Sequence, residues 1–152
     1  MMEMDVQTQP RELSNGHYKQ QVEKHMAGKR ILLVEDYPAN VLVATTLLED
    51  FGYQYEVATS GEEALQKIQN DRFDAALMDV QLGDMCGFET TRRVRAWEKN
   101  GPPPPRHLPI IAMTAHAMVG DRERCLDAGM DDYISKPFDP EELRSKLTAY
   151  AA

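Results

Sequence analysis

Short apolar runs alternate with amphipathic stretches along most of this chain. Three continuous runs are typical of buried strands, at residues 30–34, 73–78 and 109–113. Two weaker runs fit strands that flank them, at residues 53–58 and 132–135. Patterns typical of helices lie between the runs, over residues 38–51, 61–70, 88–99, 118–128 and 140–150. Five strands alternating with five helices predict an α/β domain, in which right-handed crossovers cover both faces of a parallel sheet.

Several helix ends carry local signals of their own. Asp36 can cap the first helix of this pattern, and Ser60 with Glu63 forms a capping box at the start of the second. Gly52 and Gly129 each follow the end of a helical pattern, where a left-handed residue commonly ends a helix. These signals support the helix boundaries that the apolar spacing predicts.

Two segments depart from the alternation. Residues 1–28 are polar and poor in large apolar groups, so we expect a tail or linker there and a domain over residues 29–152. A weak helical stripe lies in this first segment, at Tyr18, Val22 and Met26. The second segment is the proline run from Gly101 to Pro105, which lengthens one connection. It favours an extended surface loop over a proline-recognition ligand, because no second PxxP element accompanies it.

Composition narrows the functional classes. The 152 residues carry a net charge of -8, which argues against direct nucleic-acid binding because no basic stripe could neutralise phosphates. Two cysteines without metal-binding spacing fit reduced thiols in a cytoplasmic protein. No stretch is apolar enough for a membrane span, and no signal segment is visible, so we expect no membrane contact by this chain.

Polar side chains follow four of the five predicted strands. Glu35 and Asp36 follow the first strand in the sequence, Asp79 the third, Thr114 the fourth and Lys136 the fifth. The carboxyl ends of parallel strands lie along one edge of a sheet, so these residues are expected to converge. Carboxylates so close together require a cation, and hard oxygen ligands suit Mg²⁺. The arrangement fits phosphoryl chemistry, with Asp79 as the nucleophile because it directly follows a strand and precedes a Gly-containing loop.

Each of these residues also has a simpler explanation when taken alone. Glu35 and Asp36 fit a polar strand end and a helix cap, Asp79 a loop acid, Thr114 a cap and Lys136 a turn. Their joint placement at one sheet edge favours the shared site. A haloacid-dehalogenase-type phosphatase also uses a strand-end Asp, but it needs a second acid two residues later, where this chain has Gln. A nucleotide-binding P-loop is missing.

The quoted strand ends resemble those of response-regulator receiver domains over about residues 29–150. The segments that carry the resemblance are 31–36, 77–79, 113–115 and 133–138. The sequences of residues 113–118 and 129–133 are most similar to those of the receiver modules of hybrid sensor histidine kinases. The resemblance implies a flavodoxin-like, doubly wound parallel sheet in the order 2-1-3-4-5. It also implies a phosphorylation switch that assists its own phosphoryl transfer and dephosphorylation.

The resemblance assigns a role to each strand-end residue. Asp79 would accept a phosphoryl group from a phosphohistidine. Glu35, Asp36 and Asp79 would hold Mg²⁺, or Mn²⁺ as a substitute, together with the main-chain carbonyl of Gln81. Lys136 would pair with Asp79 and later with a phosphoryl oxygen.

The remaining roles concern the switch itself. Thr114 and the backbone amide of Ala115 would bind the other phosphoryl oxygens. Tyr133 would be the aromatic residue that turns inward as Thr114 moves. The bond between Lys136 and Pro137 would be cis, as X-Pro sequences permit at modest cost.

The expected partners are a histidine kinase, a histidine phosphotransfer protein, or both, and the resemblance leaves room for a weak homodimer. No output domain is evident in the sequence, so both a free-standing regulator and a module of a hybrid kinase fit. A receiver that has lost phosphorylation and serves only for binding is disfavoured by the intact Asp79, Thr114 and Lys136. The helix predicted at 38–51 has more apolar residues than one buried stripe requires. The surplus would dock a phosphotransfer partner or pack under a loop or residues 1–28.

Two residues of the loop after Asp79 depart from the family pattern. Gly83 stands where the family often has Pro, which is expected to loosen the loop. Cys86 stands where the family often has Asp. An inert thiol is the simpler interpretation of Cys86, with a redox sensor as the alternative.

Overall fold

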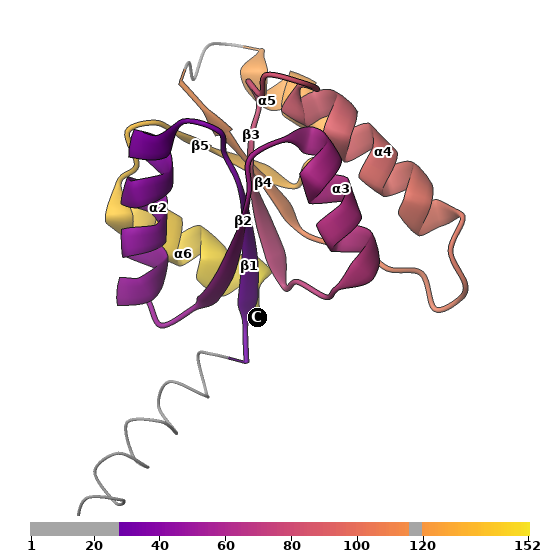
Figure 1. Cartoon of the computed structure of the whole chain (residues 1–152), viewed down its shortest axis with the longest axis horizontal. Coiled ribbons are helices and arrows are strands. Elements are labelled where there is room, and N and C mark those ends of the chain that lie inside the picture. Colours follow the sequence, from indigo (N-terminus) through magenta and orange to yellow (C-terminus); the bar gives the residue numbers. More distant parts are fainter. Residues whose placement is uncertain (1–27, 116–119) are drawn as a thin grey trace, which may run out of the picture.

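Five parallel strands form the centre of the molecule in a computed structural model that describes residues 28–115 and 120–152 (Figure 1). The strands are β1 (Arg30–Val34), β2 (Gln54–Ala58), β3 (Ala75–Asp79), β4 (Ile110–Thr114) and β5 (Asp132–Ser135). Their order in the sheet is β2-β1-β3-β4-β5, and every neighbouring pair is parallel. This order confirms the predicted doubly wound sheet, with the two weaker strands at its edges.

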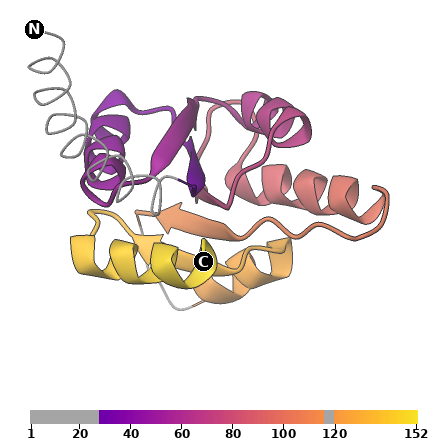
Figure 2. The same cartoon turned by 90° about the horizontal axis from the view of Figure 1, so that it is seen from below.

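Helices cover both faces of the sheet. They are α2 (Pro38–Asp50), α3 (Gly61–Asn70), α4 (Gly87–Lys99), α5 (Asp121–Ala128) and α6 (Pro140–Tyr150). Figure 2 shows α2 and α6 on one side of the strands and α3, α4 and α5 on the other. The two layers follow from right-handed crossovers that lead from β1 to β2 on one side, and then back past β1 to β3, β4 and β5 on the other.

Alternate residues of each inner strand enter opposite cores. In β1, Leu32 and Val34 pack with α3, α4 and α5, whereas Ile31 and Leu33 pack with α2 and α6. All four side chains are fully buried, and burying such a side chain contributes about 1.5–3 kcal/mol. The continuous apolar runs in the sequence therefore reflect strands covered on both faces.

The predicted glycine signals and one of the predicted caps are confirmed. Ser60 is the N-cap of α3, and its Oγ accepts a hydrogen bond from the N–H of Glu63 at 3.0 Å. Gly52 and Gly129 have φ angles of 86° and 101°, in the left-handed region that glycine adopts without strain. Every described strand and helix boundary lies close to its predicted position.

The prediction for Asp36 as a helix cap was wrong. Tyr37 is the N-cap of α2, and its side chain makes no capping hydrogen bond. Asp36 instead accepts a hydrogen bond from the N–H of Gly83, which lies in the loop after β3. A tertiary contact has replaced the local one, and it turns the Asp36 carboxylate toward the carboxyl edge of the sheet.

Some predictions concern residues that the structure does not describe. The helical stripe of the first segment and the predicted start of a helix at Met118 lie outside the described residues. Within them, α5 begins at Asp121 after Gly120, and the connection containing the prolines is exposed. The Lys136–Pro137 bond is cis, as predicted, and so is the bond between Pro103 and Pro104. None of the described helices is long and apolar enough to cross a bilayer.

Candidate functional site

The ends of β1, β3 and β5 bring the predicted site residues together. Val34 pairs with Met78, so the residues that follow these two, Glu35 and Asp79, end neighbouring strands at the same level. Thr114 pairs with Ser135 on the other side, and Lys136 follows directly. The backbone N–H of Lys136 donates to the carbonyl of Thr114 at 2.8 Å. The strand register alone therefore places residues that lie about a hundred positions apart at one edge.

Three carboxylates form a cluster at this edge. One oxygen each of Glu35, Asp36 and Asp79 lies within 4.8 Å of the others. Glu35 is 1% exposed and Asp79 5% exposed, whereas Asp36 faces solvent. Such a set of hard oxygen donors, closed on the protein side and open on the other, fits a divalent cation that retains some of its waters. Among the described residues, this is the one group of three metal-binding side chains that could share an ion.

Lys136 provides the positive charge of the cluster. Its Nζ donates to Oε1 of Glu35 at 2.6 Å and lies 3.4 Å from Oδ1 of Asp79. The other oxygen of Glu35 accepts hydrogen bonds from the backbone N–H groups of Asp36 and Tyr37. Glu35 is thus held on both oxygens, and it positions the ammonium group beside Asp79.

The two buried carboxyl groups of the cluster, Glu35 and Asp79, have pKa values shifted in opposite directions. Burial, together with the hydrogen bond to Glu35, raises the pKa of Asp79 to about 6, while the N–H of Gln81 and the charge of Lys136 act in the opposite direction. Burial also acts to raise the pKa of Glu35, but hydrogen bonds with Asp79 and Lys136 bring it below its usual value. Near neutral pH, without a cation, Asp79 is therefore the member of the pair that holds a proton most readily.

The loop after β3 closes over the cluster. The N–H of Gln81 donates to Oδ1 of Asp79 at 3.0 Å, and the N–H of Gly83 donates to Oδ2 of Asp36 at 3.2 Å. Gly87 begins α4 directly against the backbone of Asp79, where an added Cβ would lie 2.3 Å from the carbonyl oxygen of Asp79. A proline at position 83 would lack the N–H that Gly83 gives to Asp36.

Thr114 lies on the side of the cluster that faces α5. Its side chain is buried, and it borders a cavity of about 330 Å³. The residues around this cavity are Val80, Gln81, Cys86, Phe88, Thr114, Asp121, Arg124 and Cys125. Ala115 follows at the exposed end of β4, so its backbone amide belongs to the same edge.

Tyr133 belongs to a different group of side chains. It lies in β5 opposite Ala112, two residues before the position that pairs with Thr114. The ammonium group of Lys146 lies 5.3 Å from the centre of the Tyr133 ring and donates to the Tyr133 carbonyl at 2.7 Å. Lys146 had no signal in the sequence, because its partners are brought to it by the packing of α6 on β5.

Both cysteines are free thiols. Cys86 is exposed at the N-cap of α4, and Cys125 is buried in α5, where burial raises the pKa of its thiol. Both border the cavity beside Thr114. Burial and a raised pKa fit an unreactive thiol at Cys125. The prediction of an inert thiol concerned Cys86, which is exposed, and it stays a prediction.

A doubly wound sheet with an acid cluster and a lysine at its carboxyl edge defines a receiver-type signalling domain. The profile of the response regulator receiver domain matches residues 31–148. The chain belongs to this family, and it is a receiver domain of two-component phosphorelay signalling.

Relatives and solved structures agree with this assignment. The sensor histidine kinase GacS of Pseudomonas protegens is 44% identical over 116 residues, which cover 75% of this chain and 12% of that protein. The receiver domain of the sensor histidine kinase PA1611 from Pseudomonas aeruginosa, which has a magnesium ion in its active site cleft, is 42% identical. It superposes with a TM-score of 0.72 and covers 82% of this chain and 98% of its own.

A second structure shows a receiver domain with its partner. The receiver domain of Ssk1 from Saccharomyces cerevisiae, crystallised with the histidine phosphotransfer protein Ypd1, is 27% identical with a TM-score of 0.73. It covers 81% of this chain and 88% of its own. By contrast, the chain spans only about 12% of the length of the GacS proteins that it matches.

Proposed function

We propose that Asp79 accepts a phosphoryl group from a phosphohistidine in a Mg²⁺-dependent reaction. The observation that carries the proposal is the position of Asp79. Its carboxylate is buried at the end of β3, with the Lys136 ammonium 3.4 Å away and oxygens of Glu35 and Asp36 within 4.8 Å. An ionised carboxylate held beside a fixed positive charge is arranged to act as a nucleophile toward phosphorus.

Glu35, Asp36 and Asp79 would hold Mg²⁺, with the backbone carbonyl of Gln81 as a fourth ligand. When bound, the ion neutralises charge on the phosphoryl oxygens. We expect Mn²⁺ to substitute, because it accepts the same oxygen ligands. The magnesium ion in the active site cleft of the PA1611 receiver domain supports the choice of Mg²⁺ as the ion.

The transfer itself requires one bond to form and one to break. An oxygen of Asp79 forms a bond to phosphorus while the bond from phosphorus to the histidine nitrogen breaks. The imidazole ring leaves neutral if its other nitrogen carries a proton. Lys136 would move its contact from Asp79 to a phosphoryl oxygen, and the Thr114 hydroxyl and the Ala115 amide would bind the others.

The protein acts in this proposal as a switch and not as an enzyme with a separate substrate. Tyr133 would respond to the phosphate by turning toward the space beside Thr114. The donor would be a histidine kinase or a histidine phosphotransfer protein, and a parent that combined this domain with a kinase would itself be a histidine kinase. The reduced thiols Cys86 and Cys125 support a cytoplasmic location.

Labelling with acetyl phosphate tests the acceptor. Intact-mass spectrometry should show one added phosphoryl group per chain when Mg²⁺ is present and none when EDTA removes it. Asp79→Asn should abolish the addition, whereas Asp50→Asn, at an exposed position near the end of α2, should leave it unchanged. An undiminished phosphorylated peak in Asp79→Asn would overturn the assignment of the acceptor.

A further inference from the structure

The loop between β3 and α4 is attached to a helix on the other side of the site. The carboxylate of Asp84 accepts two hydrogen bonds from the start of α3, at 2.9 Å from the N–H of Gly61 and at 3.1 Å from the N–H of Glu62. These are two of the N–H groups that have no partner inside a helix. Asp84 therefore caps α3 from a distant part of the chain, while Ser60 caps the same helix locally.

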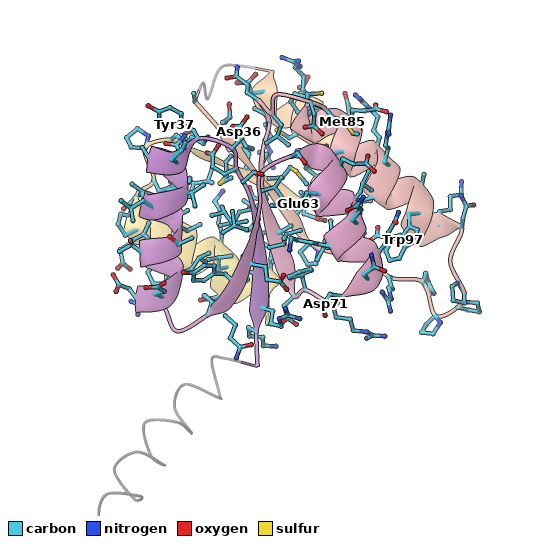
Figure 3. All side chains as sticks on the ribbon, viewed as in Figure 1. Asp36, Tyr37, Glu63, Asp71, Met85 and Trp97 are labelled. Carbon is cyan, nitrogen blue, oxygen red and sulfur yellow. The ribbon has the colours of Figure 1, made fainter. Side chains whose placement is uncertain are left out.

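The attachment lies next to the metal cluster. Gly83 precedes Asp84, and its N–H donates to Asp36 at 3.2 Å. Two neighbouring loop residues thus form hydrogen bonds in different directions. Gly83 binds the carboxylate of Asp36 in the cluster, and Asp84 binds the N-terminus of α3. Figure 3 shows Asp36 and Met85 at the same end of the molecule, on opposite sides of the strands.

The loop packs closely against the start of α3. A Cβ added to Gly61 would lie 2.4 Å from Oγ1 of Thr90 and 3.1 Å from Cβ of Met85. The Met85 side chain packs against the core under α3 and α4. The hydrogen bonds of Asp84 are therefore made at a close contact of the loop, α3 and α4.

We propose that Asp84 is a positioning residue for the metal site: by fastening the loop to α3, it holds the Gln81 carbonyl and the Gly83 N–H in register with the carboxylates. The proposal rests on the Mg²⁺ site proposed above. Gly83 leaves the loop backbone free to move, so an anchor is required close to it. A carboxylate at a helix N-terminus is such an anchor, because charge-assisted hydrogen bonds and the helix dipole both favour it.

Two variants separate positioning from stability. Asp84→Ala and Ser60→Ala each remove a cap from α3, so both are expected to lower the unfolding temperature. Only Asp84→Ala should weaken Mg²⁺ binding, by roughly tenfold in Kd as measured by calorimetric titration, which is the range for groups that orient metal ligands. In the metal-free protein, amide hydrogen exchange at Gly83 should accelerate in Asp84→Ala and remain unchanged in Ser60→Ala.

A third variant separates geometry from charge. Asp84→Asn removes the negative charge but keeps an oxygen that can accept one of the two N–H groups. We expect its Mg²⁺ affinity to lie nearer the wild type than that of Asp84→Ala. Equal losses in Asp84→Asn and Asp84→Ala would indicate a charge effect and overturn the positioning role, as would equal losses in Ser60→Ala and Asp84→Ala.

Different results would refute the proposed Mg²⁺ site and the positioning role of Asp84. If the wild type does not bind Mg²⁺, the metal site is wrong. Unchanged exchange at Gly83 in Asp84→Ala overturns the anchor, whether or not the wild type binds Mg²⁺.

Discussion

Asp79 is the residue at which stability and function oppose each other. Its folded-state pKa of about 6 lies above the usual 3.8, so the folded protein binds this proton more tightly than the unfolded chain does. The stabilising contribution is complete below about pH 4 and is lost as the pH rises through 6. At neutral pH the carboxylate is mostly ionised, as a nucleophile must be, and the fold bears the cost.

This opposition predicts a pH-dependent effect of Asp79→Asn. In EDTA at pH 8, the variant should unfold at higher urea concentration than the wild type, with a gain of up to about 3 kcal/mol from the pKa difference. At pH 4 the two proteins should have nearly equal stability, because Asp79 is then protonated. Urea unfolding at both pH values is the measurement.

Addition of Mg²⁺ serves as the control for this effect. The ion should stabilise the wild type at pH 8 by mass action, and it should stabilise Asp79→Asn less. A variant that is less stable than the wild type at pH 8 in EDTA would contradict the raised pKa.

Sequence reasoning succeeded at the residues whose place follows from strand ends. Glu35, Asp79 and Lys136 lie where the alternation of strands and helices put them, because the register of a parallel sheet aligns its carboxyl ends. The structure brings these predicted side chains together, and their proposed chemistry awaits experiment. The sequence did not predict the contact of Asp36 with the Gly83 N–H. That bond depends on how a loop folds back in space, and no periodic pattern records it.

Among the elements, α2 presents the surplus of apolar residues that the sequence indicated. Leu42 is 67% exposed and Val43 is 50% exposed, whereas Ala44 and Leu48 enter the core. Tyr37, at the start of the same helix, is also exposed and lies beside the acid cluster. We propose that the exposed side of α2 is part of a docking surface for a phosphotransfer protein. The alternative, that residues 1–28 cover these side chains, concerns a segment that lies almost wholly outside the described residues. The complex of the Ssk1 receiver domain with Ypd1 supports this class of partner.

Charge substitutions on α2 should separate docking from chemistry. Leu42→Glu and Val43→Glu are expected to slow transfer from a histidine phosphotransfer protein by about tenfold or more, since an apolar contact would be lost. Labelling by acetyl phosphate should be unaffected, because the small donor needs no docking surface. Stopped-time phosphotransfer assays with both donors provide the comparison.

Each outcome of the α2 test is informative. Thr46→Glu, at an exposed position of the same helix, is a control for added charge alone. Loss of both activities in Leu42→Glu would indicate misfolding. Retention of both would remove α2 from the docking surface.

At the same scale, some connections between elements had no signal in the sequence. Arg95 in α4 donates to the carbonyl of Gly129 at 2.8 Å and pairs with Glu98 and Asp131. These bonds link the end of α5 and the start of β5 to α4. The apolar spacing predicted each helix, but the polar ties between helices depend on packing distances that one sequence does not contain.

For the whole molecule, phosphorylation is expected to shift a population and leave the fold unchanged. Phosphate on Asp79 would draw Thr114 toward it, and Tyr133 would then leave its contact with Lys146 for the space beside Thr114. Beryllofluoride, which mimics the phosphoryl group, should therefore perturb amide resonances from Thr114 through Phe138. Two-dimensional NMR with and without beryllofluoride is the measurement.

The control for this coupling is Asp79→Asn, in which beryllofluoride should cause no perturbation. Changes confined to residues 79–87 in the wild type would show that the signal stops at the loop. In that case, Tyr133 would not report the state of Asp79.

The two ends of the described chain lie on the side of the molecule away from Asp79. Figure 1 shows the start of β1 and the carboxyl terminus at the same end of the molecule, opposite the carboxyl edge of the sheet. A polypeptide joined at either end would therefore act as a tether that leaves the carboxylate cluster free to face other domains. Flexible tethering of this kind raises the local concentration of a reaction partner to about the millimolar range, so even a weak encounter surface would be visited often.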